Sequence, residues 1–330
     1  MVKKYVGVEV YSDYRKMIVE IPLDFVIIST PPDSHSEIIR FAIDNNIHTF
    51  TEKPFALTVA DGQQTFAHLE NKPLVNQVGY VNRFHDVFME VKKLLNTGVI
   101  GKVKNFNSEM YGAIVLKDSK ASWRGKRKTG GGCMYEFASH CIDLVVYLLG
   151  QPDKVVGSVM QSIYSSDVED LVSSTFIYNN GIRGTVMVNW SDESYRKPTF
   201  IINIFGTKGK ITAYKQSYKI FLKSNDQVNG FHKGWNTRYI TDIARGVRFY
   251  VRGNEFTRQL DYFVDCIEQG RTDNIASFAE ALKTDIIMEE IIKDTALSLA
   301  TDAGAPQISP ILPKSSRRSS IWKKIWEYLK

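Results

Sequence analysis

A short apolar run broken by two prolines constrains the fold of this chain more than any other feature. Residues 25–30 (Phe-Val-Ile-Ile-Ser-Thr) have the β-branched and aromatic content of a buried parallel strand, which ends at Pro31-Pro32. A helical pattern follows, and a second strand, 48–51, leads into Glu52-Lys53-Pro54. In an open α/β sheet, ligands bind beyond the carboxyl ends of the strands. Both segments therefore predict one site at one edge of a sheet.

The chain changes its pattern after about residue 80. Before it, strand patterns at 8–11, 25–30, 48–51 and 74–78 alternate with helical ones, which predicts a parallel sheet. After it, short strands with turn signals predict a large, mostly antiparallel sheet with helices on one face. We therefore expect an α/β fold in three parts. These are an incomplete Rossmann-type nucleotide-binding domain (1–80), an α+β substrate-binding domain (81–305), and a linker with an amphipathic C-terminal helix (306–330).

Composition narrows the class of protein. The 330 residues are 43% apolar and 12% aromatic, as in globular proteins, and we find no run with the length of a membrane span. Three scattered cysteines do not make a disulfide framework, so we expect a cytoplasmic protein. The net charge of +6 suits small anionic ligands. No nucleic-acid-binding motif accompanies this charge, so we expect no nucleic-acid partner.

Lys53 is the first candidate for chemistry. A lysine beside proline at the end of a strand is most often an exposed turn residue. Its place one strand-helix unit after the Thr-Pro-Pro break favours a functional role instead. An ammonium at that edge can donate to a substrate hydroxyl and stabilise a developing alkoxide.

The helix expected over 134–149 carries the second group of candidates. Glu136 and His140 are four residues apart and share one face, and Asp143 lies three beyond His140. A carboxylate and an imidazole on one face can bind a polyol and move a proton, although such pairs are often only surface pairs. Glycines 130–132 precede the helix and allow the backbone to approach a ligand closely.

Other patterns leave several interpretations open. Asn82-Arg83 and Trp123-Arg124 lie near segment boundaries, where they could meet a ring or a phosphate or be solvated. The spacing of Cys133, His140 and Cys141 fits no zinc pattern, so we expect no metal. The stripe of tryptophan, isoleucine and leucine in 321–330 suits a helix that docks on its own oligomer, on a partner or on a membrane surface.

Taken in order, these motifs resemble the glucose–fructose oxidoreductase / inositol dehydrogenase (Gfo/Idh/MocA) family. The likeness rests on residues 24–35, on Thr-Glu-Lys-Pro-Phe-Ala-Leu-Thr (51–58), on residues 78–84, on Gly130-Gly-Gly and on Gly206-Thr-Lys-Gly-Lys-Ile, and covers about residues 8–300. It implies a Rossmann domain followed by a domain with a large antiparallel sheet. It also implies NAD- or NADP-dependent oxidation or reduction of a CH–OH carbon in a sugar, polyol or nucleotide-sugar, and a homo-oligomer formed through that sheet.

The resemblance assigns roles to individual residues. It makes Lys53 the group that steadies the reacting hydroxyl and His140 the proton acceptor. Glu136 stands where the family has aspartate, so it joins the catalytic group with a longer side chain. The implied cofactor-binding residues are Thr30, Pro31, Pro32, His35, Glu52, Lys53, Trp123 and Arg124, and the substrate-binding ones are Lys53, Asn82, Arg83, Glu136, His140 and Asp143.

One part of the family pattern is missing from the sequence. The glycine-rich strand-turn-helix (Gly-x-Gly-x-x-Gly) that grips the cofactor pyrophosphate does not occur, and the chain begins near the third expected strand. Two functions therefore remain open: a sugar or polyol dehydrogenase, and a non-catalytic sugar-binding or scaffold homologue that has lost dinucleotide binding.

Overall fold

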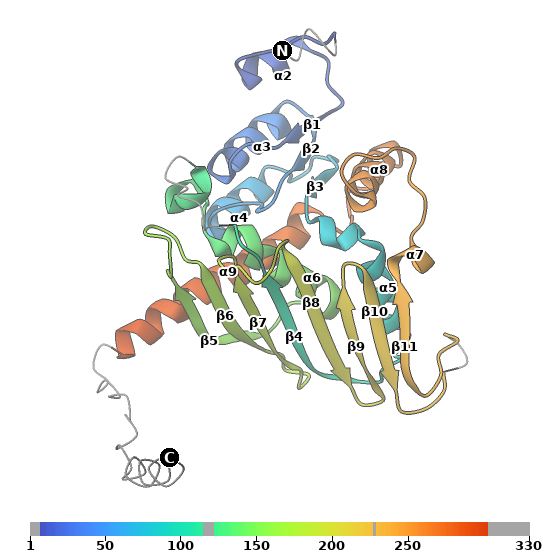
Figure 1. Cartoon of the computed structure of the whole chain (residues 1–330). Helices are drawn as coiled ribbons and strands as arrows, with labels where there is room; N and C mark the ends of the chain where they lie inside the picture. Colours follow the sequence, from blue (N-terminus) through green and yellow to red (C-terminus); the bar gives the residue numbers. More distant parts are fainter. Residues whose placement is uncertain (1–6, 115–121, 227–228, 303–330) are drawn as a thin grey trace, which may run out of the picture. The chain divides into compact units, whose positions relative to one another are not determined.

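The structure, a computed structural model, describes residues 7–114, 122–226 and 229–302 (Figure 1). Residues up to Ala296 form one compact unit. Leu297 begins a second unit, of which only the end of a long helix, to Asp302, is described. The amphipathic helix expected over 321–330 lies outside the described residues.

The first sheet is parallel and has three strands in the order β1-β2-β3. Its register pairs Phe25 with His48 and Thr49 with Asn76. The strand expected at 8–11 is wrong: Val8 and Val10 are about half exposed, and no described strand pairs with them. The strands are β1 (Phe25–Ile28), β2 (His48–Thr51) and β3 (Asn76–Val78).

β1 differs from the strand that its composition predicts. It is an edge strand whose burial alternates, with Val26 and Ile28 buried while Phe25 and Ile27 are 37% and 50% exposed. The expectation that both faces are buried is therefore wrong. Its buried side belongs to a core that continues into the adjacent helix through Ile39.

The second sheet has eight strands in the order β11-β10-β9-β8-β4-β7-β6-β5. All neighbours are antiparallel except β4 and β7, whose parallel pairing follows from the helical crossover between β4 and the β5-β6-β7 meander. The strands are β4 (Val103–Tyr111), β5 (Lys154–Gln161), β6 (Leu171–Ile177), β7 (Arg183–Asn189), β8 (Thr199–Gly206), β9 (Gly209–Tyr214), β10 (Ser217–Leu222) and β11 (Gly234–Tyr239).

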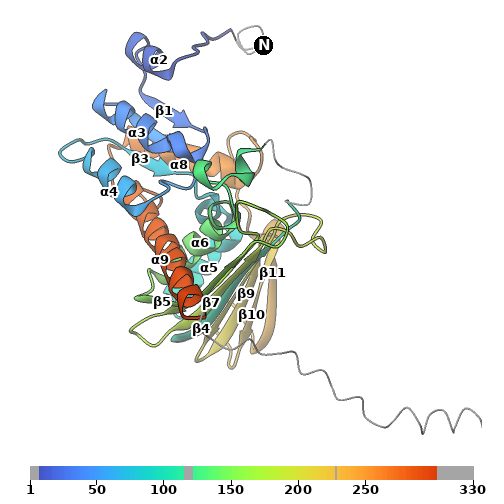
Figure 2. The same ribbon diagram turned by 90° about the vertical axis from the view of Figure 1, so that its left-hand side faces the viewer.

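Helices cover one face of this large sheet, on the side where α5, α6 and α9 lie (Figure 2). Alternate residues of β6, β7 and β8 are buried against them, which is the period-two pattern of a sheet with one covered face. The helices are α2 (Tyr14–Glu20), α3 (His35–Asp44), α4 (Val59–Ala67), α5 (Asp86–Asn96), α6 (Ser139–Leu149), α7 (Ile240–Ile243), α8 (Asn254–Glu268) and α9 (Phe278–Asp302).

Late parts of the sequence return to the first sheet. Phe263 and Cys266 of α8 pack on Phe50 and Val75, and Phe278 at the start of α9 stacks on Phe55. The two-sheet fold predicted from the sequence is confirmed. Through these contacts, α8 and α9 connect the C-terminal part of the chain to the first sheet.

One helical stretch before β5 is strongly apolar. Arg127–Leu149 is long and apolar enough to span a membrane by length and composition, but 72% of its most apolar window is buried within the protein. Burial of this kind is typical of a core helix, and here the helix packs on β4 and β7.

Candidate active site

Lys53 stands immediately beyond the carboxyl end of β2. The hydrogen-bond ladder runs up to it, because the Glu52 amide donates to the Ile28 carbonyl and the Gly79 amide donates to the Thr51 carbonyl, both at 2.8 Å. The Lys53–Pro54 peptide bond is cis. Both neighbouring strands thus fix the position of the lysine, as predicted from the sequence.

The Lys53 ammonium uses all three of its N–H donors in hydrogen bonds to Tyr135 and Glu136. Nζ lies 3.1 Å from the Tyr135 carbonyl oxygen, 3.2 Å from the Glu136 carbonyl oxygen and 3.1 Å from Glu136 Oε1. Both side chains are largely buried, with 11% and 13% of their surface exposed. The first sheet and the helix after the glycine segment therefore meet at this ion pair.

The segment that receives Lys53 is a π-helical turn, η5 (Met134–Ala138), which runs directly into α6. Its Tyr135 carbonyl also accepts a hydrogen bond from the Ser139 hydroxyl, at 2.7 Å. The Met134 amide donates to Glu169 Oε1 at 2.8 Å, which anchors the start of the turn. Such turns recur at functional sites because they free backbone carbonyls for other partners.

The Glu136 carboxylate bridges two cations. Oε1 pairs with Lys53, and Oε2 accepts from Arg124 Nε at 3.1 Å. Burial works to raise the pKa of Glu136, but the charges of Lys53 and Arg124 outweigh burial and hold that pKa below its usual value. Glu136 is therefore a fixed anion beside Lys53.

His140 lies one helical turn beyond Glu136. Its Nδ1 is buried without a hydrogen-bond partner in the described part of the chain, and the residue lines a cavity. Burial lowers the pKa of His140 well below its usual value, and the ammonium groups of Lys53 and Lys215 act in the same direction. The imidazole is thus neutral near physiological pH and able to accept a proton.

A cavity of about 180 Å³ joins Lys53 and His140. Pockets for drug-sized ligands run from about 300 to 1,000 Å³, so this cavity suits a smaller ligand. Its lining has a polar and an apolar part, formed by Glu52, Lys53, Gly79, Val81, Asn82, Met110, His140, Pro198, Phe200, Lys215 and Phe256.

The residues expected to face a cofactor divide into exposed and buried ones. Thr30 and Pro31 are exposed at the end of β1, and Arg124 lies over the Trp123 ring, 4.7 Å from its centre. Pro32 is buried. His35 is fully buried, with Nδ1 3.0 Å from the Pro54 carbonyl oxygen and Nε2 2.9 Å from the Thr30 carbonyl oxygen. His35 thus braces the two strand ends behind the site.

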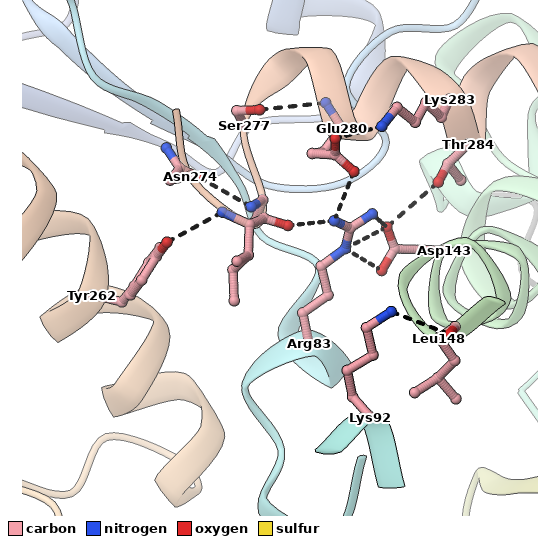
Figure 3. Close-up of polar contacts among 12 residues, drawn as sticks. Arg83, Lys92, Asp143, Leu148, Tyr262, Asn274, Ser277, Glu280, Lys283 and Thr284 are labelled. Atoms are coloured by element: carbon pink, nitrogen blue, oxygen red, sulfur yellow. Dashed lines mark hydrogen bonds and ion pairs between the residues drawn. The ribbon is translucent and has the colours of Figure 1, made fainter. Parts of the chain in front are cut away.

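Arg83 and Asp143 face each other rather than the cavity (Figure 3). Arg83 Nη2 lies 2.7 Å from Asp143 Oδ1, and both side chains are 1% exposed. Arg83 also donates to the Ile275 carbonyl and pairs with Glu280, so it links the segment after β3 with α6 and α9. A larger groove of about 890 Å³ borders Arg83, but neither Lys53 nor His140 lines it.

The glycines before η5 serve close packing within the protein. A side chain at Gly131 would collide with the Arg124 backbone, and one at Gly132, whose φ is 112°, would collide with Glu169. These glycines therefore allow neighbouring segments of the chain to pack closely. The sequence pattern alone predicts instead that they allow a ligand to approach closely.

Sequence reasoning missed Lys215. It lies in the two-residue turn between β9 and β10 and lines the cavity beside Phe200 and Phe256. A lysine in a hairpin turn is ordinarily solvated, so the local sequence carries no signal for this position. Among the described residues, no group of three histidine, cysteine, aspartate or glutamate side chains could hold a metal ion.

Comparison with known proteins places this architecture. The family model of the oxidoreductase NAD-binding Rossmann fold matches residues 1–80, and that of the GFO/IDH/MocA C-terminal domain matches residues 88–212. The chain belongs to the GFO/IDH/MocA oxidoreductase family. The resemblance seen in the sequence is thus confirmed.

Relatives of this GFO/IDH/MocA chain are distant. It is 26% identical to an uncharacterized oxidoreductase of Schizosaccharomyces pombe over 297 residues, 88% of this chain and 77% of that protein. It is 24% identical to the NAD-dependent scyllo-inositol 2-dehydrogenase of Bacillus subtilis over 293 residues, 86% of this chain and 80% of that protein.

Solved structures share the fold of the GFO/IDH/MocA chain at low identity. A levoglucosan dehydrogenase in complex with NADH and levoglucosan matches with a TM-score of 0.78 and 23% identity, over 89% of this chain and 84% of that one. The aldose-aldose oxidoreductase of Caulobacter crescentus, complexed with glycerol, matches with a TM-score of 0.76 and 22% identity, over 90% and 85%.

The cofactor class follows from the family. The matched N-terminal model is that of an NAD-binding domain, which confirms the prediction of a nicotinamide cofactor. The described residues suit its reactive end, because Thr30 and Pro31 are exposed at a strand end close to the segment that carries Lys53. A Gly-x-Gly-x-x-Gly turn for the pyrophosphate is not found among them.

Proposed function

We propose that this chain is an NAD(P)-dependent dehydrogenase that acts on a CH–OH carbon of a sugar, polyol or nucleotide-sugar. One observation carries the proposal: an anchored lysine and a neutral histidine line the same small cavity at the carboxyl edge of the parallel sheet. The bound nicotinamide supplies the hydride acceptor or donor at this edge.

Lys53 and His140 divide the work on the substrate hydroxyl. Lys53 donates a hydrogen bond to the hydroxyl oxygen and stabilises the charge that develops there. Since its three donors are already engaged, the substrate oxygen shares or replaces one acceptor. His140 accepts the hydroxyl proton through Nε2. Glu136 takes part by holding Lys53 in place.

The remaining predicted residues would hold the cofactor and the sugar. Thr30, Pro31, Pro32, Glu52, Trp123 and Arg124 would border the nicotinamide half of the cofactor, with His35 bracing the strand ends behind them. Asn82, which lines the cavity, would meet the sugar hydroxyls. Arg83 lies in η2 (Val81–Phe84) and Asp143 lies in α6, so their ion pair would hold these two elements in place beside the site.

Cofactor titration tests the proposal. NADH and NADPH are added to the purified chain and binding is followed by fluorescence. Lys53→Ala is expected to abolish turnover while cofactor affinity stays within about threefold, because the ammonium acts on the reacting oxygen. Lys154→Ala, an exposed residue at the start of β5, is the control. Unchanged turnover in Lys53→Ala would refute the role of Lys53.

A non-catalytic sugar-binding or scaffold protein is the alternative. The absence of a glycine-rich phosphate turn from the sequence favours it. The same titration separates the two, because failure to bind NADH or NADPH at millimolar concentration excludes the dehydrogenase for this polypeptide.

We also propose that the chain forms a homo-oligomer through the second sheet, and that it works in the cytoplasm. The face opposite α5, α6 and α9 carries half-exposed or exposed residues that hydrogen-bond across strands, such as Asn107 with Thr185. Light scattering coupled to size exclusion checks the oligomeric state; a strictly monomeric chain would contradict it.

A further inference from the structure

Lys215 is a cationic residue of the cavity whose charge the proposed chemistry does not use. It follows β9 directly, and with Gln216 it makes the turn into β10. It is half-buried and lines the cavity together with Lys53 and His140. Two ammonium groups therefore face a space of about 180 Å³.

The two lysines differ in how their charges are balanced. Lys53 is neutralised by Glu136 and hydrogen-bonded by two carbonyls. Lys215 makes no hydrogen bond or ion pair with the described residues, and Glu255 is the carboxylate that acts on it electrostatically. Glu52, the carboxylate that lines the cavity, interacts instead with Lys53 and Glu136.

The charge of Lys215 affects the titration of neighbouring groups. It helps to lower the pKa of His140, and after burial it is the largest influence on His85, whose pKa falls to about 4. Burial also lowers the pKa of Lys215 itself. A partly desolvated ammonium without a hydrogen-bonded counter-ion is costly, and a bound anion would relieve that cost.

The surroundings indicate which anion fits. Pro198, Phe200 and Phe256 line the cavity beside Lys215. A single ammonium balances one negative charge, as a carboxylate carries, whereas a phosphate monoester carries about 1.5 to 2 negative charges at neutral pH. One small, singly charged group matches this lining. Lys53, His140 and Lys215 line one cavity of about 180 Å³, so the anion and the reacting hydroxyl fit as parts of one small molecule.

We propose that Lys215 binds a carboxylate of the substrate, so that the preferred substrate is a sugar acid or polyhydroxy acid. This inference rests on the proposed function, since it assigns the substrate class of the same cavity. The carboxylate pairs with Lys215 while a hydroxyl of the same molecule lies between Lys53 and His140.

Three ligands that differ at one carbon test it: D-glucuronate, D-glucose and D-glucose 6-phosphate, with carboxylate, hydroxymethyl and phosphate at C6. Calorimetry on the full chain gives the dissociation constants. We expect glucuronate to bind at least about tenfold more tightly than glucose, as for a charge-assisted pair. Lys215→Met should remove this preference and leave glucose within about threefold, while Lys215→Arg should retain it.

Lys219→Met, at an exposed position of β10, is the matched control and should behave as the unmodified chain. Melting temperatures show whether each variant is folded. Equal affinity for glucuronate and glucose, or an undiminished preference in Lys215→Met, would overturn the inference. So would tighter binding of glucose 6-phosphate than of glucuronate. Absence of binding of any ligand at about 50 mM would also overturn it, because usual substrate affinities are far tighter. None of these measurements needs the cofactor, so a failure of NADH to bind is a separate result that concerns the proposed function alone.

Discussion

The Lys53 ammonium and the Glu136 carboxylate lie 3.1 Å apart, although 83 positions separate them in the chain. This pair joins the end of a parallel strand to the helix that carries His140. The geometry of the candidate site thus depends on an interaction between the two parts of the fold, and removing either partner should disturb both.

Glu136→Gln should weaken the protein in a pH-dependent way. The pKa of Glu136 in the folded chain lies below its usual value of 4.5, so its stabilisation is present above that value and is lost as the pH falls through the folded pKa. Melting temperatures at about pH 7 should be lower in the variant, and the difference should shrink at about pH 3.5. Glu70→Gln, at an exposed position, is the control. A difference that does not change with pH would contradict the charge of Glu136.

His140 should stay neutral across the pH range in which histidine usually titrates. Burial depresses its pKa, so the unfolded chain takes up the proton first and stability falls as the pH drops below 6.5. An NMR titration should show the imidazole resonance that disappears in His140→Asn unmoved between about pH 8 and 6. A midpoint near 6.5 would show an open, solvated ring instead.

Arg83→Met alone should destabilise strongly, because it leaves the buried Asp143 carboxyl group without its counter-ion. Loss of one partner of a buried pair costs about 3–5 kcal/mol, whereas replacement of both by apolar residues is often near neutral. Urea unfolding of Arg83→Met, Asp143→Leu and the double variant should therefore show a double variant more stable than the sum of the single losses. Strictly additive losses would mean that the two side chains act independently.

Asp285→Asn should stabilise the protein at neutral and higher pH. Asp285 is buried in α9, accepts a hydrogen bond from the Ala56 amide at 3.1 Å, and has no described partner for Oδ1. Burial raises its pKa well above 3.8, so stability is lost as the pH rises from 3.8 through the folded pKa. Thermal melts at about pH 8 should favour the variant, and those at about pH 4 should not. The exposed Asp273→Asn controls for net charge; an equal gain there would point to surface charge as the cause.

The sequence predicted most of the regular structure because hydrophobic periodicity reflects burial. The large, mostly antiparallel sheet expected after about residue 80 follows from it. β11 (Gly234–Tyr239) was missed because it is an edge strand without a buried residue, so it lacks the alternation of buried and exposed positions. Residues 247–252 alternate charged and apolar side chains as a strand would, yet they form no strand in the described structure.

The candidate site was predictable only as far as local rules reach. The strand-edge rule located Lys53, and helical spacing put Glu136 and His140 on one face. The mutual pairing of Arg83 with Asp143 and the entry of Lys215 into the cavity depend on long-range packing, which no local pattern encodes.

The π-helical turn at η5 allows this site to accept amino-acid substitutions during evolution. Two of the three hydrogen bonds of Lys53 go to main-chain carbonyls, which every residue type provides. The lysine therefore keeps most of its anchorage whichever acidic side chain occupies position 136. A glutamate can therefore occupy the position where the family resemblance leads one to expect aspartate. Side chains around the reacting carbon can change during evolution without moving the Lys53 ammonium.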